Sequence, residues 1–402
     1  MNRFLLITLA LAGCTDTRDA ITGTQSLEVT LVAPADPCPV SGLADTERTI
    51  TVNIRAKDAQ NQLDTTFTKD VQVYAQFLGT LTPSFGDVPL ATFTVTNGVA
   101  DNQSVTLPNA FGRTTLWIDD GEGVGPDYVH GSVTGTSPIL CYRDPFISDL
   151  QKPRDETALD ALSSTPLQDK QIGVHTSRYG DTGFLVVTSV FAQGYTVSDV
   201  QCADTNASPP CTYQAYDHAM VFTFSAPRLD GRSIEVGEVI GGFAGGLSEF
   251  NGLTEIGFPQ TFAPVDKAGQ PVSFSVDPAR IPAPAVLTAD WFKSLTDPSG
   301  GMINFERNEA APIEIDNAKV CDLDDDFATF KQWKLDPAGV GGNCAGNRNV
   351  LNVITNGISE IDPPSLVGQT LPKVVGVLRP VNIGSFNVWI IFPRDANDVT
   401  LP

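Results

Sequence analysis

The run Phe184-Leu-Val-Val-Thr-Ser-Val190, followed after a short gap by Gly194-Tyr-Thr-Val-Ser-Asp199, decides the fold of the second half of this chain. Both runs are short and rich in β-branched residues, which favours strands, and the gap between them suits a hairpin turn. Runs of this kind recur along the whole sequence between clusters of turn residues. With 35 glycines, 29 prolines and almost no helical patterning in 402 residues, the sequence predicts an all-β protein.

The order of segments after this hairpin resembles the OB-fold modules that accompany secreted bacterial nucleases. Val221-Phe-Thr-Phe224 and Val236-Gly-Glu238 precede Ser248-Glu-Phe-Asn-Gly-Leu-Thr-Glu-Ile256, much as a Gly-Asp-x-Val segment precedes a Glu-Tyr-Asn-Gly-x-Thr hairpin in those modules. A second unit is similar to the partner module of the same proteins: Glu306 to Val320 resembles its opening strand, and Trp389-Ile-Ile-Phe-Pro-Arg-Asp-Ala-Asn-Asp398 its closing strand and tail. The resemblance implies a fold and no activity, because the catalytic nuclease domain has no counterpart in this sequence.

The two units also resemble each other. Val236-Gly237 in the first unit corresponds to Val367-Gly368 in the second, and Phe258-Pro259 corresponds to Phe392-Pro393. If the units are related five-stranded barrels, the two glycines occupy equivalent turns before the fourth strand, and the two Phe-Pro pairs end the fifth strand. Chance similarity between β-rich sequences is the alternative.

The first part of the chain is predicted to form a β-sandwich. Short runs such as Leu27 to Val32 and Thr49 to Ala56 alternate along the strand, so that one face points into a two-sheet core. The segment resembles bacterial immunoglobulin-like domains in the patterns Asn53-Ile-Arg-Ala-Lys-Asp58 and Leu107-Pro-Asn-Ala-Phe-Gly112. The predicted fold is therefore an immunoglobulin-like sandwich followed by two OB-like barrel modules.

These patterns divide the chain into seven parts. The predicted parts are a signal peptide (1–13), a tether (14–25), the immunoglobulin-like sandwich (26–142), a linker (143–170), the first OB-like module (171–265), a second linker (266–283) and the second OB-like module (284–402).

The N-terminus predicts a bacterial lipoprotein. Arg3 provides a positive charge, and Phe4 to Leu11 form an apolar run too short to span a bilayer. The run ends in Leu11-Ala-Gly-Cys14, which looks like a lipobox, so we expect Cys14 to be lipidated and to become the new N-terminus. The expected location is the cell envelope, at the outer membrane, on its periplasmic or surface face. An ordinary signal peptide with an incidental cysteine is the alternative.

The cysteines also indicate export. Without Cys14, six of the seven cysteines remain, an even number that suits disulfides in an oxidising compartment. Their positions favour a local pairing scheme, although the sequence leaves the other connectivities open. The expected pairs are Cys38–Cys141, Cys202–Cys211 and Cys321–Cys344.

Two acidic clusters are candidate calcium sites. Asp119, Asp120, Glu122 and Asp127 lie in a glycine-containing loop, where oxygen ligands can wrap an ion. Residues 322–326 hold four aspartates but lack the glycine and glutamate of an EF-hand loop. Solvated loops are the alternative for both clusters, and no other cofactor is expected.

No enzymatic signature is present, so we expect no catalytic activity; an enzyme with an unrecognised site stays open. The sequence contains no Gly-x-Ser-x-Gly, His-Glu-x-x-His or Gly-Lys-Ser/Thr motif. The glycine-rich run Gly241 to Gly246 precedes no helix and is interpreted as a bend that closes a barrel. His175 and His218 lack an identifiable nucleophile and third partner, and are interpreted as loop residues.

The function expected from the sequence is that of a non-catalytic envelope lipoprotein, which presents its OB-like modules to a protein or glycan partner. OB barrels bind ligands on one face with stacked aromatic side chains. An accessory binder of extracellular nucleic acid is the alternative, and the formal net charge of −22 makes a nucleic-acid partner unfavourable. The candidate aromatic residues, each of which a barrel core would also accommodate, are Phe191, Tyr195, Phe250, Phe386 and Trp389.

Overall fold

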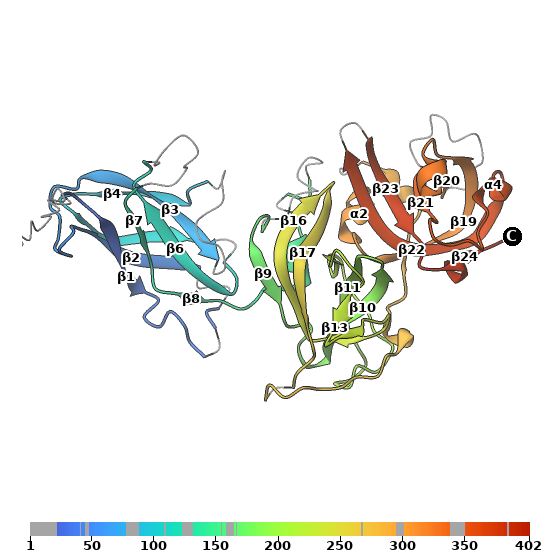
Figure 1. Ribbon diagram of the computed structural model, residues 1–402, viewed down its shortest axis with the longest axis horizontal. Coiled ribbons are helices and arrows are strands. Elements are labelled where there is room, and N and C mark those ends of the chain that lie inside the picture. Colours follow the sequence, from blue (N-terminus) through green and yellow to red (C-terminus); the bar gives the residue numbers. More distant parts are fainter. Residues whose placement is uncertain are drawn as a thin grey trace, which may run out of the picture.

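The computed structural model describes residues 22–40, 42–44, 48–77, 88–107, 110–122, 132–153, 155–157, 165, 167–266, 268–294, 301–337, 350–383 and 386–402. The predicted lipidation site Cys14, together with Asp127 and Cys344, lies outside these residues. Three β-structured parts follow one another in a row, and the C-terminus lies at the far end of the last part (Figure 1). The protein is all-β, as predicted, with a few short helices.

The first part is a sandwich of two sheets. One sheet has the order β1-β2-β5 and the other β4-β3-β6-β7, with β8 paired to β6. Alternation along β2 buries Ile50, Val52 and Ile54 completely between the sheets, which explains why this run forms a strand with one inner face. The strands are β1 Ser26–Ala33, β2 Thr49–Lys57, β3 Lys69–Phe77, β4 Ala91–Val95, β5 Val99–Thr106, β6 Arg113–Asp119, β7 Thr134–Thr136 and β8 Leu140–Cys141.

The second part is a five-stranded barrel. Around the ring, β10 pairs with β11, β11 with β12, β12 with β17, and β17 with β16. Gly241 separates β16 from β15, and the two together form the fourth strand in chain order. β15 pairs with β10 and closes the ring. The β12–β17 pair is parallel and the other pairs are antiparallel, which is the Greek-key arrangement of an OB barrel. The strands of this part are β9 Gln171–Val174, β10 Gly183–Phe191, β11 Gly194–Gln201, β12 His218–Phe222, β13 Arg228–Leu229, β14 Arg232–Ser233, β15 Val239–Ile240, β16 Gly242–Phe250 and β17 Leu253–Phe262.

The third part repeats this ring in the order β19, β20, β21, β23 and β22. Its third and fifth strands in chain order, β21 and β23, are again parallel. Its strands are β18 Ala285–Val286, β19 Pro312–Leu323, β20 Gln332–Asp336, β21 Leu351–Ile354, β22 Thr370–Ile383, β23 Phe386–Phe392 and β24 Val399–Thr400. The short helices of the chain are α1 Ile147–Gln151, η2 Gly180–Thr182, η3 Pro278–Arg280, η4 Ala289–Phe292, α2 Ile303–Arg307, α3 Phe327–Phe330, α4 Pro363–Leu366 and η5 Ala396–Asp398.

The two barrels share the predicted glycine turn. Gly237 and Gly368 both have a φ of +83°, and each lies just before the fourth strand. The Gly237 N–H donates to the Val187 carbonyl on the first strand of its barrel at 2.8 Å, and the Gly368 N–H donates to the Val320 carbonyl at the same distance. The repeat is therefore a property of the structure and not a coincidence of composition.

One detail of the predicted repeat is wrong. Phe258-Pro259 does not end the fifth strand of the first barrel: it lies at a bulge inside β17, which continues to Phe262. Only Phe392 ends its strand.

The disulfides Cys38–Cys141 and Cys202–Cys211 are both present, in agreement with the expected local pairing. Cys321 is also disulfide-bonded, and its pairing with Cys344 stays a prediction.

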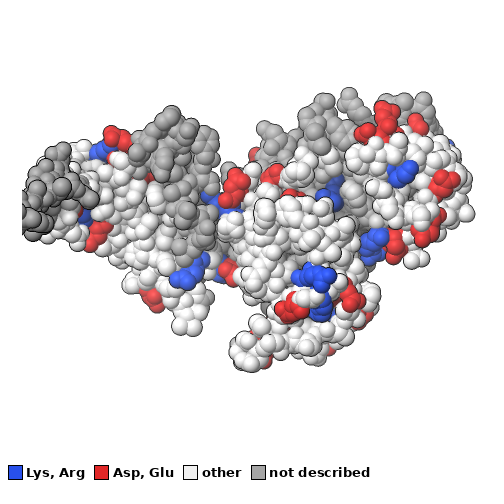
Figure 2. Space-filling model, in the orientation of Figure 1, with Lys and Arg blue, Asp and Glu red and all other residues white. Residues whose placement is uncertain are grey.

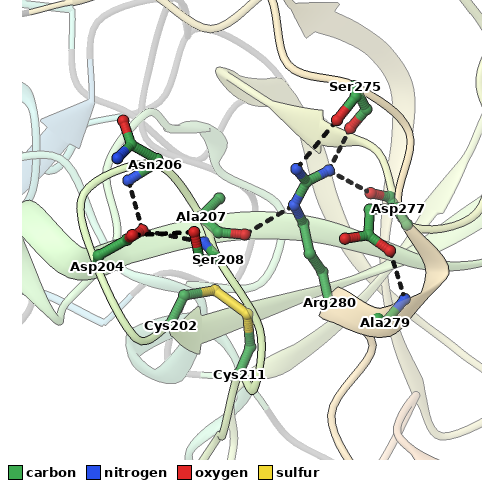
Figure 3. Close-up of a disulfide and its surroundings, with 11 residues drawn as sticks. Cys202, Asp204, Asn206, Ala207, Ser208, Cys211, Ser275, Asp277, Ala279 and Arg280 are labelled. Carbon is green, nitrogen blue, oxygen red and sulfur yellow. Dashed lines mark hydrogen bonds between the residues drawn. A yellow bond between two sulfur atoms is a disulfide. The ribbon is translucent and has the colours of Figure 1, made fainter.

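The described parts of the two predicted linkers are not free connections, because they pack onto the first barrel. In the first linker, Ile147 and Leu150 of α1 are fully buried in the barrel core. In the second, the buried Arg280 donates from Nε to the carbonyl of Ala207 at 2.8 Å and also bonds to the carbonyl of Ser275, beside the Cys202–Cys211 disulfide (Figure 3). Apolar burial and charge-assisted hydrogen bonds thus hold both segments in place.

Candidate ligand-binding site

A pocket of about 450 Å³ lies where the sandwich meets the first barrel. β9 is on the side of the barrel that faces the sandwich (Figure 1). Pockets of this size at the junction of two modules are typical places for ligands. The lining comes from the start of β6, the segment after β8, and the outer surface of β9, β16 and β17; its residues are Phe111, Gly112, Arg113, Asp144, Pro145, Gln171, Ile172, Gly173, His175, Ala244, Gly245, Phe258 and Gln260.

The two sides of the pocket are fixed to each other. Phe111 belongs to the sandwich part of the chain, yet it is buried in the core of the first barrel together with Ile172. The Arg143 guanidinium lies 5.0 Å from the centre of the Phe111 ring, and the Gly112 N–H donates to the Arg143 carbonyl at 2.8 Å. The pocket is therefore a packed junction and not a gap between loosely linked modules.

Small residues form the floor of the pocket. Gly173, Ala244 and Gly245 lie on neighbouring strands β9 and β16. A Cβ on Gly245 would come within 2.6 Å of the Gly257 carbonyl, so only glycine fits there. The predicted bend in the same glycine-rich run lies slightly earlier, where Gly241 approaches the Ala263 carbonyl too closely for a side chain. The run thus closes the barrel and also hollows its outer surface.

Polar side chains surround this floor. His175 Nδ1 lies 2.8 Å from Asp144 Oδ2, and both side chains are 42% exposed. Gln171 and Gln260, both exposed, add amide donors and acceptors, and Arg113 adds an exposed cation. The rim therefore offers both donors and acceptors to a ligand.

Three phenylalanines, here called the phenylalanine ladder, extend from the pocket: Phe222, Phe224 and Phe258. The rings of Phe224 and Phe258 stack with centroids 4.5 Å apart, and Phe222 meets Phe224 edge to face at the same distance. Phe258 is 84% exposed and Phe224 is 48% exposed. Their φ angles of +49° and +59° are unusual for bulky residues.

This exposure does not serve folding. Leaving a phenylalanine ring in water forgoes about 2 kcal/mol of burial free energy, and a positive φ at a non-glycine residue costs about 1 kcal/mol more. Unfavourable backbone conformations of this kind gather at functional sites. The bulge opposite Gly245 displays the Phe258 ring at the mouth of the pocket, where both costs are offset if a ligand covers the ring.

The phenylalanine ladder was not predicted from the sequence. Among the candidate aromatic residues expected from the sequence, Tyr195 is buried in the core of the first barrel. Trp389 stacks on Phe305 at the core of the second barrel. Phe191 is partly buried, and the Phe386 side chain lies outside the described set. Phe250 is 59% exposed, at the tip of the β16–β17 hairpin. The only signal for the ladder was the Phe-Pro pair itself, opposite two glycines.

The usual ligand face of an OB barrel, on its second and third strands, is covered in the first barrel. The outward side chains Ser198, His218 and Met220 are each at most 2% exposed. The Tyr213 ring packs edge-on against His218, and Ala310 of the third part packs in one apolar cluster with Met220. Ligands of this module must therefore use another surface.

The prediction of a loop residue holds for His175, which directly follows β9, and is wrong for His218. His175 lies on the pocket rim. His218 lies in β12, where its Nδ1 is 2.7 Å from Ser198 Oγ. Burial, with a smaller effect of the Arg178 charge, lowers the pKa of His218 to about 3, so the imidazole is neutral. Both Ser198 and His218 are fully buried, and no substrate reaches this pair in the structure described.

The carboxylates of the predicted calcium loop bond to protein groups. Asp119 accepts from the Trp117 indole at 2.9 Å, and Lys69 contacts Asp120 at 3.4 Å and Glu122 at 2.6 Å. In the described part of the chain, no three His, Cys, Asp or Glu side chains are grouped in a way that would hold a metal ion. Within that same part, no helix has the length and apolar character needed to cross a membrane.

Comparisons with protein-family models, with curated proteins and with solved structures found no match to this chain.

Proposed function

We propose that this chain is a lipid-anchored, non-catalytic binding protein of the bacterial cell envelope. Its pocket and phenylalanine ladder bind a protein or glycan partner, and the lipid on Cys14 holds it at the outer membrane. The observation that carries the proposal is the ladder, because two exposed, stacked rings beside a concave polar site are typical of a binding surface. The two disulfides support a location outside the cytoplasm.

A nucleic-acid partner is the second candidate and is the less favoured one. The OB arrangement of the barrels supports it. The covered face of the first barrel and the net charge of −22 argue against it. On the face that Figure 2 shows, the described lysine and arginine side chains are scattered among acidic ones and form no continuous basic stripe, which nucleic-acid binding requires.

The anchor and the binding surface are tested together with unlipidated protein. Cys14→Ser is expected to lose incorporation of radiolabelled fatty acid, since the thiol that carries the lipid is gone. Lipid labelling equal to wild type would contradict the lipoprotein assignment.

The Cys14→Ser form is then sedimented with isolated envelopes of the producing bacterium. Adding Phe258→Asn is expected to raise the apparent dissociation constant about tenfold, the equivalent of about 1.4 kcal/mol. Asparagine tolerates the positive φ of this position. The matched control Phe250→Asn removes another exposed ring roughly 16 Å away along β16 and is expected to bind normally. Equal loss in both variants, or no loss with Phe258→Asn, would contradict the proposed site.

A further inference from the structure

We propose that the ligand of the pocket and ladder is an extended, predominantly uncharged oligosaccharide of the envelope. This inference rests on the proposed function and names the class of its partner. A pyranose ring has one face of C–H groups and a rim of hydroxyls. The site presents both complements side by side, as stacked aromatic faces and a polar hollow.

The ladder matches the apolar face of a sugar. Phe258 and Phe224 are exposed to solvent, and their rings are inclined by only 30° to each other. Phe222 continues the row behind them. Flat aromatic surfaces with low conformational freedom bind ring faces at small entropic cost.

The pocket matches the hydroxyl rim. Vicinal hydroxyls are both donors and acceptors, and the rim supplies both types of group through Gln171, Gln260 and the His175–Asp144 pair. Among the described residues that line the pocket, Arg113 is the one lysine or arginine, and the carboxylate of Asp144 lines the same pocket. An anionic ligand would gain little net attraction from this combination. A helical peptide would need a continuous apolar groove, which the polar rim and glycine floor do not provide.

The position of Phe258 implies a chain of sugars and not a single one. Its ring lines the pocket and also stacks on Phe224. One sugar placed in the pocket therefore leaves ladder surface for the next. Affinity is expected to increase with chain length until the ligand spans the pocket and both exposed rings, and then to level off.

The test uses affinity electrophoresis of the Cys14→Ser form through gels that contain one purified polymer each. The polymers are peptide-free glycan strands of peptidoglycan, O-polysaccharide and capsular polysaccharide. Double-stranded DNA and a peptide digest of envelope proteins represent the other ligand classes. We expect one polysaccharide to retard the protein, with a dissociation constant about tenfold higher for Phe258→Asn and unchanged for Phe250→Asn. Ala244→Leu, which fills the floor and leaves the ladder intact, is expected to weaken binding as well.

The outcomes separate the inference from the proposed function. If no polysaccharide retards the protein while envelopes still bind it through Phe258, the partner is not a glycan and the inference is wrong, although the binding site stands. Retardation by DNA or by the peptide digest alone would also overturn it. Circular dichroism of each variant establishes folding, and the use of two independent variants, one in the ladder and one in the floor, keeps the test decisive if one of them misfolds.

Discussion

Gly237→Ala is expected to lower the free energy of unfolding by about 3–4 kcal/mol, whereas the equivalent Gly368→Ala lowers it by about 1–2 kcal/mol. Both positions have a φ of +83°, so both variants incur the same left-handed backbone cost. The surroundings differ. A Cβ on Gly237 would lie 2.5 Å from the Asp277 carbonyl carbon and 2.7 Å from the Pro278 nitrogen, whereas a Cβ on Gly368 would meet nothing within 4 Å.

The additional cost at Gly237 arises from the segment that Arg280 holds against the first barrel (Figure 3). Because the clashing atoms are backbone, they have little freedom to move aside. Urea denaturation of the mature chain with its disulfides intact measures the two midpoints. Equal shifts of the two midpoints would show that residues 266–283 move aside as a flexible linker would. That result would contradict the packing described for this segment.

Glu309→Gln is expected to stabilise the protein by about 2–3 kcal/mol at pH 8 and by less than about 1 kcal/mol at pH 5. Glu309 lies at the contact between the two barrels, where its Oε1 accepts from the Thr254 N–H at 2.9 Å. Its Oε2 has no hydrogen-bond partner among the described residues. Burial and the charges of Glu306 and Glu249 raise the pKa of Glu309 well above its usual range. Arg379 is the nearby opposing charge.

The direction of the pH dependence follows from these raised pKa values. Burial also raises the pKa of Glu306, and raises that of Glu249 to about 7. The folded state therefore holds protons that the unfolded state releases near pH 4.5, so stability from this cluster is greatest at low pH and is lost as the pH rises toward and beyond 7. A glutamine at position 309 keeps the acceptor for Thr254 and removes one buried charge.

Denaturation midpoints measured from pH 5 to pH 8 test this expectation. The pKa values of Asp199 and His218 are also shifted in the folded state. Because both residues are present in wild type and variant, the difference between the wild-type and Glu309→Gln curves reports on the glutamate cluster alone. The exposed Glu360→Gln serves as the control and is expected to give a curve parallel to wild type. A Glu309→Gln curve that also runs parallel to wild type would refute the proposed charge burial.

Much of the fold was predictable because it depends on local patterns. Alternation in Thr49–Lys57 predicted a strand with one buried face, and the glycines at 237 and 368 predicted matching turns. The ladder was not predictable, since its exposure depends on a bulge that shifts β17 against β16. The carboxylate cluster was also not predictable, because Glu249 comes close to Glu306 and Glu309 only when the two barrels pack against each other. Long-range packing also explains why Ile147 and Arg280 are buried in segments that look like linkers.

We expect the ligand to bind at the junction of the sandwich and the first barrel. Hydrogen–deuterium exchange of the unlipidated chain, measured with and without envelope polysaccharide, locates the bound ligand. Binding is predicted to slow exchange in residues 171–175, 218–224 and 253–262, which carry the rim and the ladder. Protection confined to the second and third strands of the last barrel, 332–336 and 351–354, would place the ligand on the usual OB face and contradict binding at the junction.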